Sequence, residues 1–561
     1  MNVKNINRKF ILVAIVSLLF FLLFSKLIYV QICLHKKINN IVKKMVMCRN
    51  VEMSKRGDIL DSKGKILASS IKKYTIFLDT KIIDDFYKVK NILFSNGIAI
   101  KVNNLNKLKK TSYYPIAFDV NVDTVDKIRS KRLRGVGFES KYKRFYPEGR
   151  FLAHILGITG FDGNGLEGIE KIYNEVLSGH PIVTKVRRDG YGRIIHDKFV
   201  NEMITCGQNV ELSIDSNIQF IAEQELREAF DKYKAKKAIC IIQNPKTGAI
   251  LAMVSLPDFD SSNYKIKDIK TLRNSAITDI YEPGSTFKIV AIAAALEQNK
   301  ISPTDNFYLE NGKYRIARHT IKDNHKIDGY VSLKKIMEQS SNIGIVKITQ
   351  KLGAENFYDY IKKFGFYSLT GIDLPGESKG ILVDIDKWNA LSLPTISFGQ
   401  GIGVTAIQVI NAFSAIANDG VLMKPSVIHS IADSTEIKTI FKPREIRRVI
   451  SVKTAKTIKE LLMSVVEFGT GKSAKIVNYT VGGKTGTAQK VDPLTKRYST
   501  KNYVVSFCGM IPAINPEIVI LVIIDEPKHS NYYASSVASP IFAKIAEKTV
   551  LYLNIKKDDM K

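Results

Sequence analysis

The stretch that decides the fold reads Pro283-Gly284-Ser285-Thr286-Phe287-Lys288-Ile289-Val290-Ala291-Ile292-Ala293-Ala294-Ala295-Leu296. The Pro-Gly pair predicts a turn, and the residues after it predict a helix. Because that helix is apolar on nearly every face, we expect it to be buried inside a domain. Ser285 and Lys288 stand three residues apart at its start, so their side chains should share one face.

This pair of residues suits nucleophilic catalysis. Ser285 would lie at the positive end of the helix dipole, which favours an alkoxide. A buried Lys288 would lose its proton easily, because desolvation disfavours the ammonium form, and the neutral amine could then take the Ser285 proton. The spacing alone is weak evidence, since it recurs elsewhere without a buried helix behind a Pro-Gly turn. The other pairs are Ser62/Lys65, Ser70/Lys73, Ser140/Lys143 and Ser332/Lys335.

Two further segments carry residues of the same chemistry. Ser340-Ser341-Asn342 falls between two apolar-periodic runs, where Ser340 and Asn342 can both point into a cleft. A plain helix cap is the alternative for this segment. The second segment is Gly482-Gly483-Lys484-Thr485-Gly486-Thr487-Ala488.

The second segment predicts a strand. Lys484 and Gly486 would share one face of it. Gly486 would let a substrate approach the backbone, and the Thr487 amide could donate to an oxyanion. An edge strand with bulges, or a phosphate-binding turn, is the alternative. The P-loop pattern does not fit, because Asn478 stands where it needs glycine.

The order S-x-x-K, S-x-N, K-T-G resembles that of the penicillin-recognising serine acyltransferases. No histidine lies inside these motifs, so a Ser-His-Asp triad is not supported.

The strand and helix patterns around the motifs predict a mixed α/β (α+β) fold. Residues 238–242 and 249–254 read as a β-hairpin, and 504–507 and 518–524 as two more strands. Helical runs at 285–297 and 453–467 lie between them. We therefore expect an antiparallel sheet covered by helices.

The N-terminus predicts a membrane anchor. Residues 10–30 form an apolar run long enough, at ~1.5 Å per residue, to span a bilayer core. The run continues without a small-residue cleavage site, which favours an uncleaved anchor over a signal peptide. The predicted organisation is a cytoplasmic tail (1–9), anchor (10–30), juxtamembrane linker (31–50), non-catalytic module (51–225), catalytic domain (226–555) and tail (556–561).

Composition excludes some classes of function. The net charge of +30 comes from lysines spread along the 561 residues, which is typical of compositional bias and not of a nucleic-acid binder. Attraction of the surface to anionic envelope material is the alternative. The five cysteines contain no close pair, so neither a metal site nor a disulfide framework is expected. We predict no metal and no cofactor.

The resemblance to known proteins extends along the chain to class B penicillin-binding proteins. The segments that carry it are Arg56–Ala68, Arg144–Gly149, Gly165–Glu170, Arg188–Gly190, Gly399–Thr405 and Gly469–Gly471. Glu282, before Pro283-Gly284, and the segment Ile524–Lys528 resemble the division-specific, FtsI-type members. Elongation-type members tend to carry proline at the position of Glu282. Ala534-Ser535 and Gly482 depart from the family pattern.

The resemblance implies a peptidoglycan D,D-transpeptidase that cross-links stem peptides during septal cell-wall synthesis. It implies catalytic roles for Ser285, Lys288, Ser340, Asn342 and Lys484. It also implies substrate-binding roles for Thr485, Gly486 and Thr487. The alternatives are an elongation-type transpeptidase, a D,D-carboxypeptidase or β-lactamase-like hydrolase, and a receptor or an idle scaffold.

The same resemblance implies the partners and the location. The substrates are stem peptides on glycan derived from lipid-linked precursors, and β-lactams are inhibitors. A membrane glycosyltransferase and divisome proteins are the expected protein partners. The protein is expected in the cytoplasmic membrane with a single span and an extracytoplasmic catalytic domain.

Overall fold

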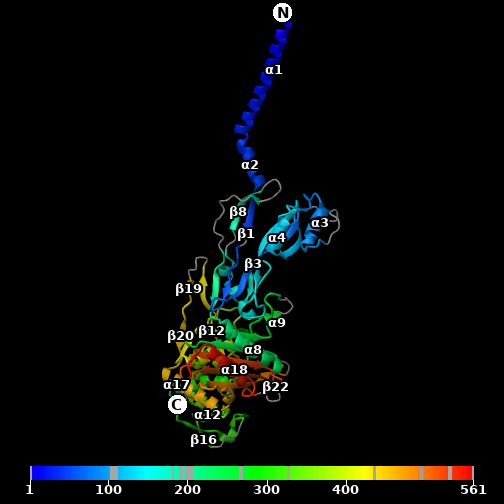
Figure 1. Ribbon diagram of the computed structural model, residues 1–561. Helices are drawn as coiled ribbons and strands as arrows, with labels where there is room; N and C mark the ends of the chain where they lie inside the picture. Colours follow the sequence, from blue (N-terminus) through cyan, green and yellow to red (C-terminus); the bar gives the residue numbers. More distant parts are fainter. Residues whose placement is uncertain are drawn as a thin grey trace. The chain divides into compact units, whose positions relative to one another are not determined.

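The computed structural model describes residues 3–52, 54–100, 111–179, 182–188, 194–195, 206–263, 269–324, 329–433, 438–492, 495, 497–528 and 533–558 (Figure 1). The chain divides into two compact units. The first unit comprises residues 1–55, 72–142 and 179–206. The second comprises residues 56–71, 143–178 and 207–561.

The first unit begins with a long apolar helix. Helix α1 (Val3–Ile28) continues into a π-helical turn, η1 (Tyr29–Cys33). Residues 8–33 have a mean hydropathy of 2.7 and none of that stretch is buried, so it has the length and composition of a membrane span. The predicted anchor at 10–30 lies within α1 and the first residues of η1.

The rest of the first unit is α+β. Strand β1 (Met47–Glu52) pairs antiparallel with β8 (Ile182–Arg188), and β8 pairs with β9 (Ile194–Ile195). The end of strand β3 (Ile66–Leu78) pairs with β4 (Tyr114–Val120), and β5 (Val136–Phe145) also pairs with β3. The helices are α2 (His35–Val46), α3 (Phe86–Ser95) and α4 (Val122–Arg129). Of the segment Arg188–Gly190, residues 189 and 190 lie outside the described residues.

A five-stranded antiparallel sheet forms the core of the second unit, in the order β12-β11-β23-β22-β21. Its strands are β11 (Lys237–Gln243), β12 (Ile250–Leu256), β21 (Gly482–Val491), β22 (Tyr498–Ile511) and β23 (Ile518–Asp525). The predicted hairpin is β11–β12, and the two later strands are β22 and β23. The expected antiparallel sheet is thus confirmed.

Helices cover both faces of this sheet because its strands are apolar on both sides. Helices α8 (Ser216–Lys232) and α18 (Ala538–Tyr552) pack together over one face, around Cys240, Phe507 and Phe542 (Figure 1). On the other face, α16 (Ala406–Ala417) packs on β11, β22 and β23. Helix α11 (Lys288–Glu297) lies in the same core cluster, and nine of its ten residues are buried.

A second sheet joins chain segments that are far apart in the sequence. Strand β10 (Asn209–Leu212) pairs with β18 (Ile428–Ala432) and, in parallel, with β2 (Ile59–Leu60). Strand β18 also pairs with β19 (Lys438–Ile440), and β2 pairs with the start of β3. This sheet lies in the second unit and unites its first segment with strands from residues 209–212 and 428–440.

The second unit also holds several shorter elements. They are α5 (Ala153–Leu156), β6 (Ile158–Thr159), β7 (Gly165–Glu167), α6 (Gly168–Ile172), α7 (Asn174–Ser178), α9 (Ile269–Leu272), α10 (Ser275–Thr278), β13 (Asn306–Tyr308), β14 (Lys313–Ile316), β15 (His319–Lys322), β16 (Tyr330–Ser332), α14 (Ala354–Lys363), α15 (Ser392–Ser397), β17 (Val421–Met423), β20 (Glu445–Arg448) and α17 (Val452–Phe468). The predicted helix at 453–467 is α17.

Three of the segments that carry the family resemblance meet at the buried carboxylate of Glu170. Glu170 is fully buried; its Oε2 accepts a hydrogen bond from Arg56 Nε at 2.5 Å, and its Oε1 accepts one from Arg144 Nε at 2.6 Å. Arg56 also donates to the Glu170 carbonyl at 2.7 Å. Buried charges of this kind are tolerated only when they are paired and hydrogen-bonded.

Replacing Glu170 with alanine should destabilise the second unit by about 3–5 kcal/mol, because two buried guanidinium groups would lose their counter-charge. Denaturant unfolding of the full chain in detergent measures this loss. Glu148→Ala is the matched control: its ion pair with Lys65 is half-exposed on both sides, so a change below about 1 kcal/mol is expected. Equal losses in the two variants would contradict a structural role for the buried cluster.

Candidate active site

Ser285 lies in a tight turn that enters the buried helix α11. Residues Gly284–Phe287 form a 3-10 turn, η4, and α11 begins at Lys288. In a 3-10 turn, side chains three residues apart eclipse each other, so Ser285 and Lys288 share a face as predicted. Ser285 is partly exposed, whereas Lys288 is fully buried.

A second loop holds the turn in place. Gly284 N donates to the Gly399 carbonyl at 3.1 Å. A Cβ on Gly399 would come within 2.2 Å of the Gly284 oxygen, and Gly399 has a φ of +82°. The segment Gly399–Thr405 therefore includes a glycine because the Ser285 turn packs directly against its backbone.

Ser340 occupies a break between two helices. Helix α12 (Leu333–Glu338) ends before it and α13 (Asn342–Leu352) begins after it, as the sequence predicts. Ser340 adopts a left-handed φ of 53°, which is uncommon for a residue with a Cβ. Backbone strain of this kind persists only when the surroundings hold it, and it concentrates at functional sites.

Lys288 connects the two motifs. Its Nζ donates to the Ser340 carbonyl at 2.6 Å, to Asn342 Oδ1 at 2.8 Å and to Ser340 Oγ at 3.2 Å. Asn342 Nδ2 donates to the Lys322 carbonyl at 3.0 Å, which orients the amide with its oxygen toward Lys288. Among the described residues, no hydrogen bond joins Lys288 to Ser285.

The third motif contributes Lys484, which lies on β21, an edge strand of the five-stranded sheet. Its Nζ donates to Ser340 Oγ at 2.9 Å. The Ser340 hydroxyl thus lies between two lysine amines, and both lysines are fully buried.

Burial perturbs both lysines. It lowers the pKa of Lys288 well below its ordinary value, and the neighbouring charge of Lys484 lowers it further. Burial lowers the pKa of Lys484 to about 7. Lys288 is therefore neutral in a pH range where an exposed lysine is an ammonium ion, as a general base requires.

The remaining residues of the third motif lie along β21. Thr485 is buried, and its Oγ1 lies 2.8 Å from the Oγ1 of Thr470, a residue of the Gly469–Gly471 segment. Thr487 is partly exposed, and its Oγ1 accepts from the Ala534 amide at 3.3 Å. The Ala534-Ser535 departure from the family pattern thus lies beside Thr487.

The packing around residue 486 requires glycine. A Cβ there would lie 2.5 Å from Ser506 Oγ, 2.9 Å from the Pro283 carbonyl and 2.9 Å from Thr286 Cγ2. The missing side chain is needed so that β21 can pack against the Ser285 turn.

Sequence reasoning missed Asp323, whose carboxylate accepts from the Ser341 hydroxyl and from the Asn342 backbone amide. It follows β15 and stands 18 residues before Ser341, so its only sequence signal is an acidic residue at a strand end. The sequence marks Glu282 only through family resemblance; in the structure its Oε1 accepts from the Gly401 amide at 2.8 Å and from the Tyr498 hydroxyl at 3.1 Å.

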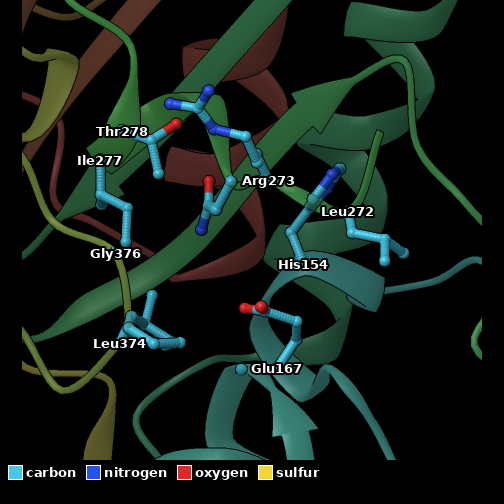
Figure 2. Close-up of a pocket in the computed structure, with 11 residues that line it drawn as sticks. His154, Glu167, Leu272, Arg273, Ile277, Thr278, Leu374 and Gly376 are labelled. Atoms are coloured by element: carbon cyan, nitrogen blue, oxygen red, sulfur yellow. The ribbon is translucent and has the colours of Figure 1, made fainter. Parts of the chain in front are cut away.

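A cavity of about 250 Å³ lies elsewhere in the second unit (Figure 2). Its walls include His154, Glu167, Arg273 and Thr278, and Figure 2 shows Glu167 and Arg273 on different sides of it. The described residues that line it include none of the eight predicted site residues.

A partly exposed serine with a buried lysine three residues later is typical of serine acyltransferases that use lysine as the base. Family models agree with this class. Residues 238–547 match the penicillin-binding protein transpeptidase domain, and residues 51–212 match the penicillin-binding protein dimerisation domain. The chain belongs to the penicillin-binding protein transpeptidase family, as a class B member.

Named relatives cover nearly the whole chain. Stage V sporulation protein D of Bacillus subtilis is 34% identical, over 99% of this chain and 88% of the relative. Peptidoglycan D,D-transpeptidase FtsI of Buchnera aphidicola is 33% identical, over 99% of this chain and 97% of the relative. The Escherichia coli protein of the same name is 30% identical, over 90% of this chain and 84% of its own length.

Solved structures show the same fold. Penicillin-binding protein 3 of Mycobacterium tuberculosis, complexed with aztreonam, has a TM-score of 0.71 and 27% identity, with 91% of this chain and 98% of that chain covered. A peptidoglycan synthetase of Bifidobacterium adolescentis has a TM-score of 0.75 and 25% identity, with 92% and 98% covered.

Proposed function

We propose that this protein cross-links peptidoglycan by acyl transfer from stem peptides that end in D-alanyl-D-alanine. Ser285 Oγ attacks the penultimate carbonyl while Lys288 takes its proton. The D-alanine leaves as an amine after receiving a proton through Ser340, and the acyl group stays on Ser285. The amine of a second stem peptide then attacks this ester, which forms the new amide bond and restores the Ser285 hydroxyl.

The observation that carries this proposal is the hydrogen-bonded group of Lys288, Ser340 and Lys484. Ser340 Oγ accepts from both buried amines, at 3.2 and 2.9 Å. A hydroxyl held between two lysines of lowered pKa can pass a proton from one side of the site to the other. That is the step that the departing D-alanine amine needs.

The other motif residues have supporting roles in this proposal. The backbone amides of Ser285 and Thr487 stabilise the oxyanion, at about 3 kcal/mol per donor. The terminal carboxylate is attracted by Lys484, Thr485 and Thr487. The hydrogen bond to Thr470 holds the Thr485 hydroxyl in place. Asn342 holds the substrate amide, and Gly486 keeps β21 against the nucleophile's turn.

Acyl transfer can be separated from hydrolysis by following one acyl group. The full chain in detergent is incubated with a fluorescent penicillin, and the lifetime of the adduct is measured with and without an acceptor amine. A slowly decaying adduct, together with dimeric muropeptides from purified peptidoglycan precursor, is the expected result. Rapid release of hydrolysed penicillin would instead indicate a carboxypeptidase or β-lactamase-like hydrolase.

The proposed site of action is the division septum. Support comes from the FtsI names of two relatives and from Glu282, which stands where elongation-type members tend to have proline. A fluorescent fusion should concentrate at midcell in dividing cells. Uniform label along the side wall would contradict the septal role, and label confined to a forming spore would favour the role in the name of the Bacillus relative.

We further propose that helix α1 spans the cytoplasmic membrane once, with the catalytic domain outside the cytoplasm. Residues 8–33 support this by length and hydropathy. Divisome proteins and a membrane glycosyltransferase, which would supply the glycan strands, are the proposed partners. Crosslinking from residues of α1 in intact cells, followed by identification of the adducts, tests this part.

The two lysines predict a bell-shaped pH dependence for acylation. The acidic limb belongs to Lys288, which must be neutral to act as base. The basic limb falls near pH 7, because Lys484 must be protonated to attract the substrate carboxylate and its pKa is about 7. Stopped-flow acylation between pH 5 and 10 should show both limbs. Lys484→Arg keeps the charge and should move the basic limb upward, and an unmoved limb would assign it to another group.

A further inference from the structure

Asp323 lies directly after β15 and binds the residues that follow Ser340. Its Oδ1 accepts from the amides of Asn342 at 2.5 Å and Ile343 at 3.1 Å. Its Oδ2 accepts from Ser341 Oγ at 2.7 Å. One carboxylate thus holds three consecutive residues at the start of α13.

These contacts stabilise the segment next to Ser340, whose backbone is strained. Ser340, immediately before them, has a left-handed φ of 53°, and its hydroxyl and carbonyl both accept from Lys288. The Lys322 carbonyl, next to Asp323, accepts from Asn342 Nδ2 at 3.0 Å. The 322–323 segment therefore fixes both the backbone and the side-chain orientation of Asn342, and with them the position of Ser340.

Asp323 also carries a charge that acts on Lys288. Two charged groups face Lys288 among the described residues: Lys484 from β21 and Asp323 from the connection after β15. Lys484 lowers the pKa of Lys288, and Asp323 raises it. Without the carboxylate, two buried amines would share a cleft without a counter-charge.

We infer that Asp323 is a positioning residue for acyl transfer, which holds Ser340 and Asn342 against Lys288 and supplies the counter-charge for the buried amines. The inference rests on the proposed function of Ser285 and Lys288. It goes beyond that function because Asp323 lies in none of the three motifs and acts through residues that do.

The competing explanation is a plain helix cap. Ser341 is the N-cap residue of α13, and its Oγ accepts from the Gly344 amide at 2.9 Å. Asp323 could serve only to stabilise that cap. Ser341→Ala is therefore the matched control, because it removes the cap and one Asp323 contact while the carboxylate charge stays near Lys288.

The test compares Asp323→Asn, Asp323→Glu and Ser341→Ala in the full chain in detergent. For each variant, acylation by a fluorescent penicillin is followed between pH 5 and 10, together with the Tm. Asp323→Asn should slow acylation by 10- to 100-fold and move the acidic limb to lower pH, since the ammonium form of Lys288 loses its stabilising charge. Asp323→Glu should restore the position of that limb.

The outcomes separate the hypotheses. Ser341→Ala should lower the Tm without moving the limb. If Asp323→Asn lowers the Tm and the rate as Ser341→Ala does, with an unmoved acidic limb, Asp323 is only a cap and the inference fails. If the wild-type chain itself forms no adduct, the proposed function fails instead.

Discussion

Ser285→Ala should abolish covalent labelling by penicillin and cross-linking together. The loss of rate should be on the order of 10⁶-fold, because the nucleophile of a catalytic unit cannot be replaced by its partners. Ser285 is partly exposed, so the loss of its hydroxyl creates no cavity in the core. We therefore expect an unchanged Tm, and intact-protein mass spectrometry measures the adduct.

The neighbouring Thr286 supplies the control for this prediction. Thr286 is buried, and its hydroxyl donates to the Pro283 carbonyl at 2.8 Å. Thr286→Ser keeps that bond and should keep most of the labelling. An adduct of full yield on Ser285→Ala would mean that another residue is the nucleophile, and the proposed mechanism would be wrong.

Much of this site could be predicted from the sequence because several of its residues are close together along the chain. Ser285 and Lys288 are three residues apart in one turn, so helical geometry alone places them on one face. The break at Ser340 is also local, since the apolar periodicity stops there and resumes after it. The meeting of Lys288 with Ser340 and Lys484 is tertiary, and the resemblance to a family is what anticipates it.

Other features could not be predicted because they depend on contacts between distant segments. The need for glycine at residue 486 comes from Pro283 and Ser506, which approach it from two other elements. The sheet that unites β10 with β18 joins residues more than 200 positions apart, and local composition gives no signal of such a pairing. Asp323 stands 18 positions before Ser341, and an isolated aspartate at a strand end does not indicate which residues it will contact.

Lys288→Met should leave the fold intact while it slows acylation by about 10²–10⁴-fold, which is the usual contribution of a general base. Methionine fills a similar volume in this fully buried position. The variant loses the hydrogen bonds to Ser340 and Asn342, so its Tm near pH 9 should lie below that of the wild type.

The pH dependence of this difference in Tm shows which protonation state of Lys288 the folded protein favours. The folded-state pKa of Lys288 is lowered, so between that pKa and 10.5 the unfolded chain binds more protons than the folded chain. The free energy of unfolding of the wild type therefore falls as the pH drops through this window, and the Lys288→Met variant lacks that part of the fall. The Tm deficit of the variant should shrink from pH 9 to pH 6. A deficit that grows toward low pH would mean that the folded protein stabilises the Lys288 ammonium, in which case Lys288 could not be the base for Ser285.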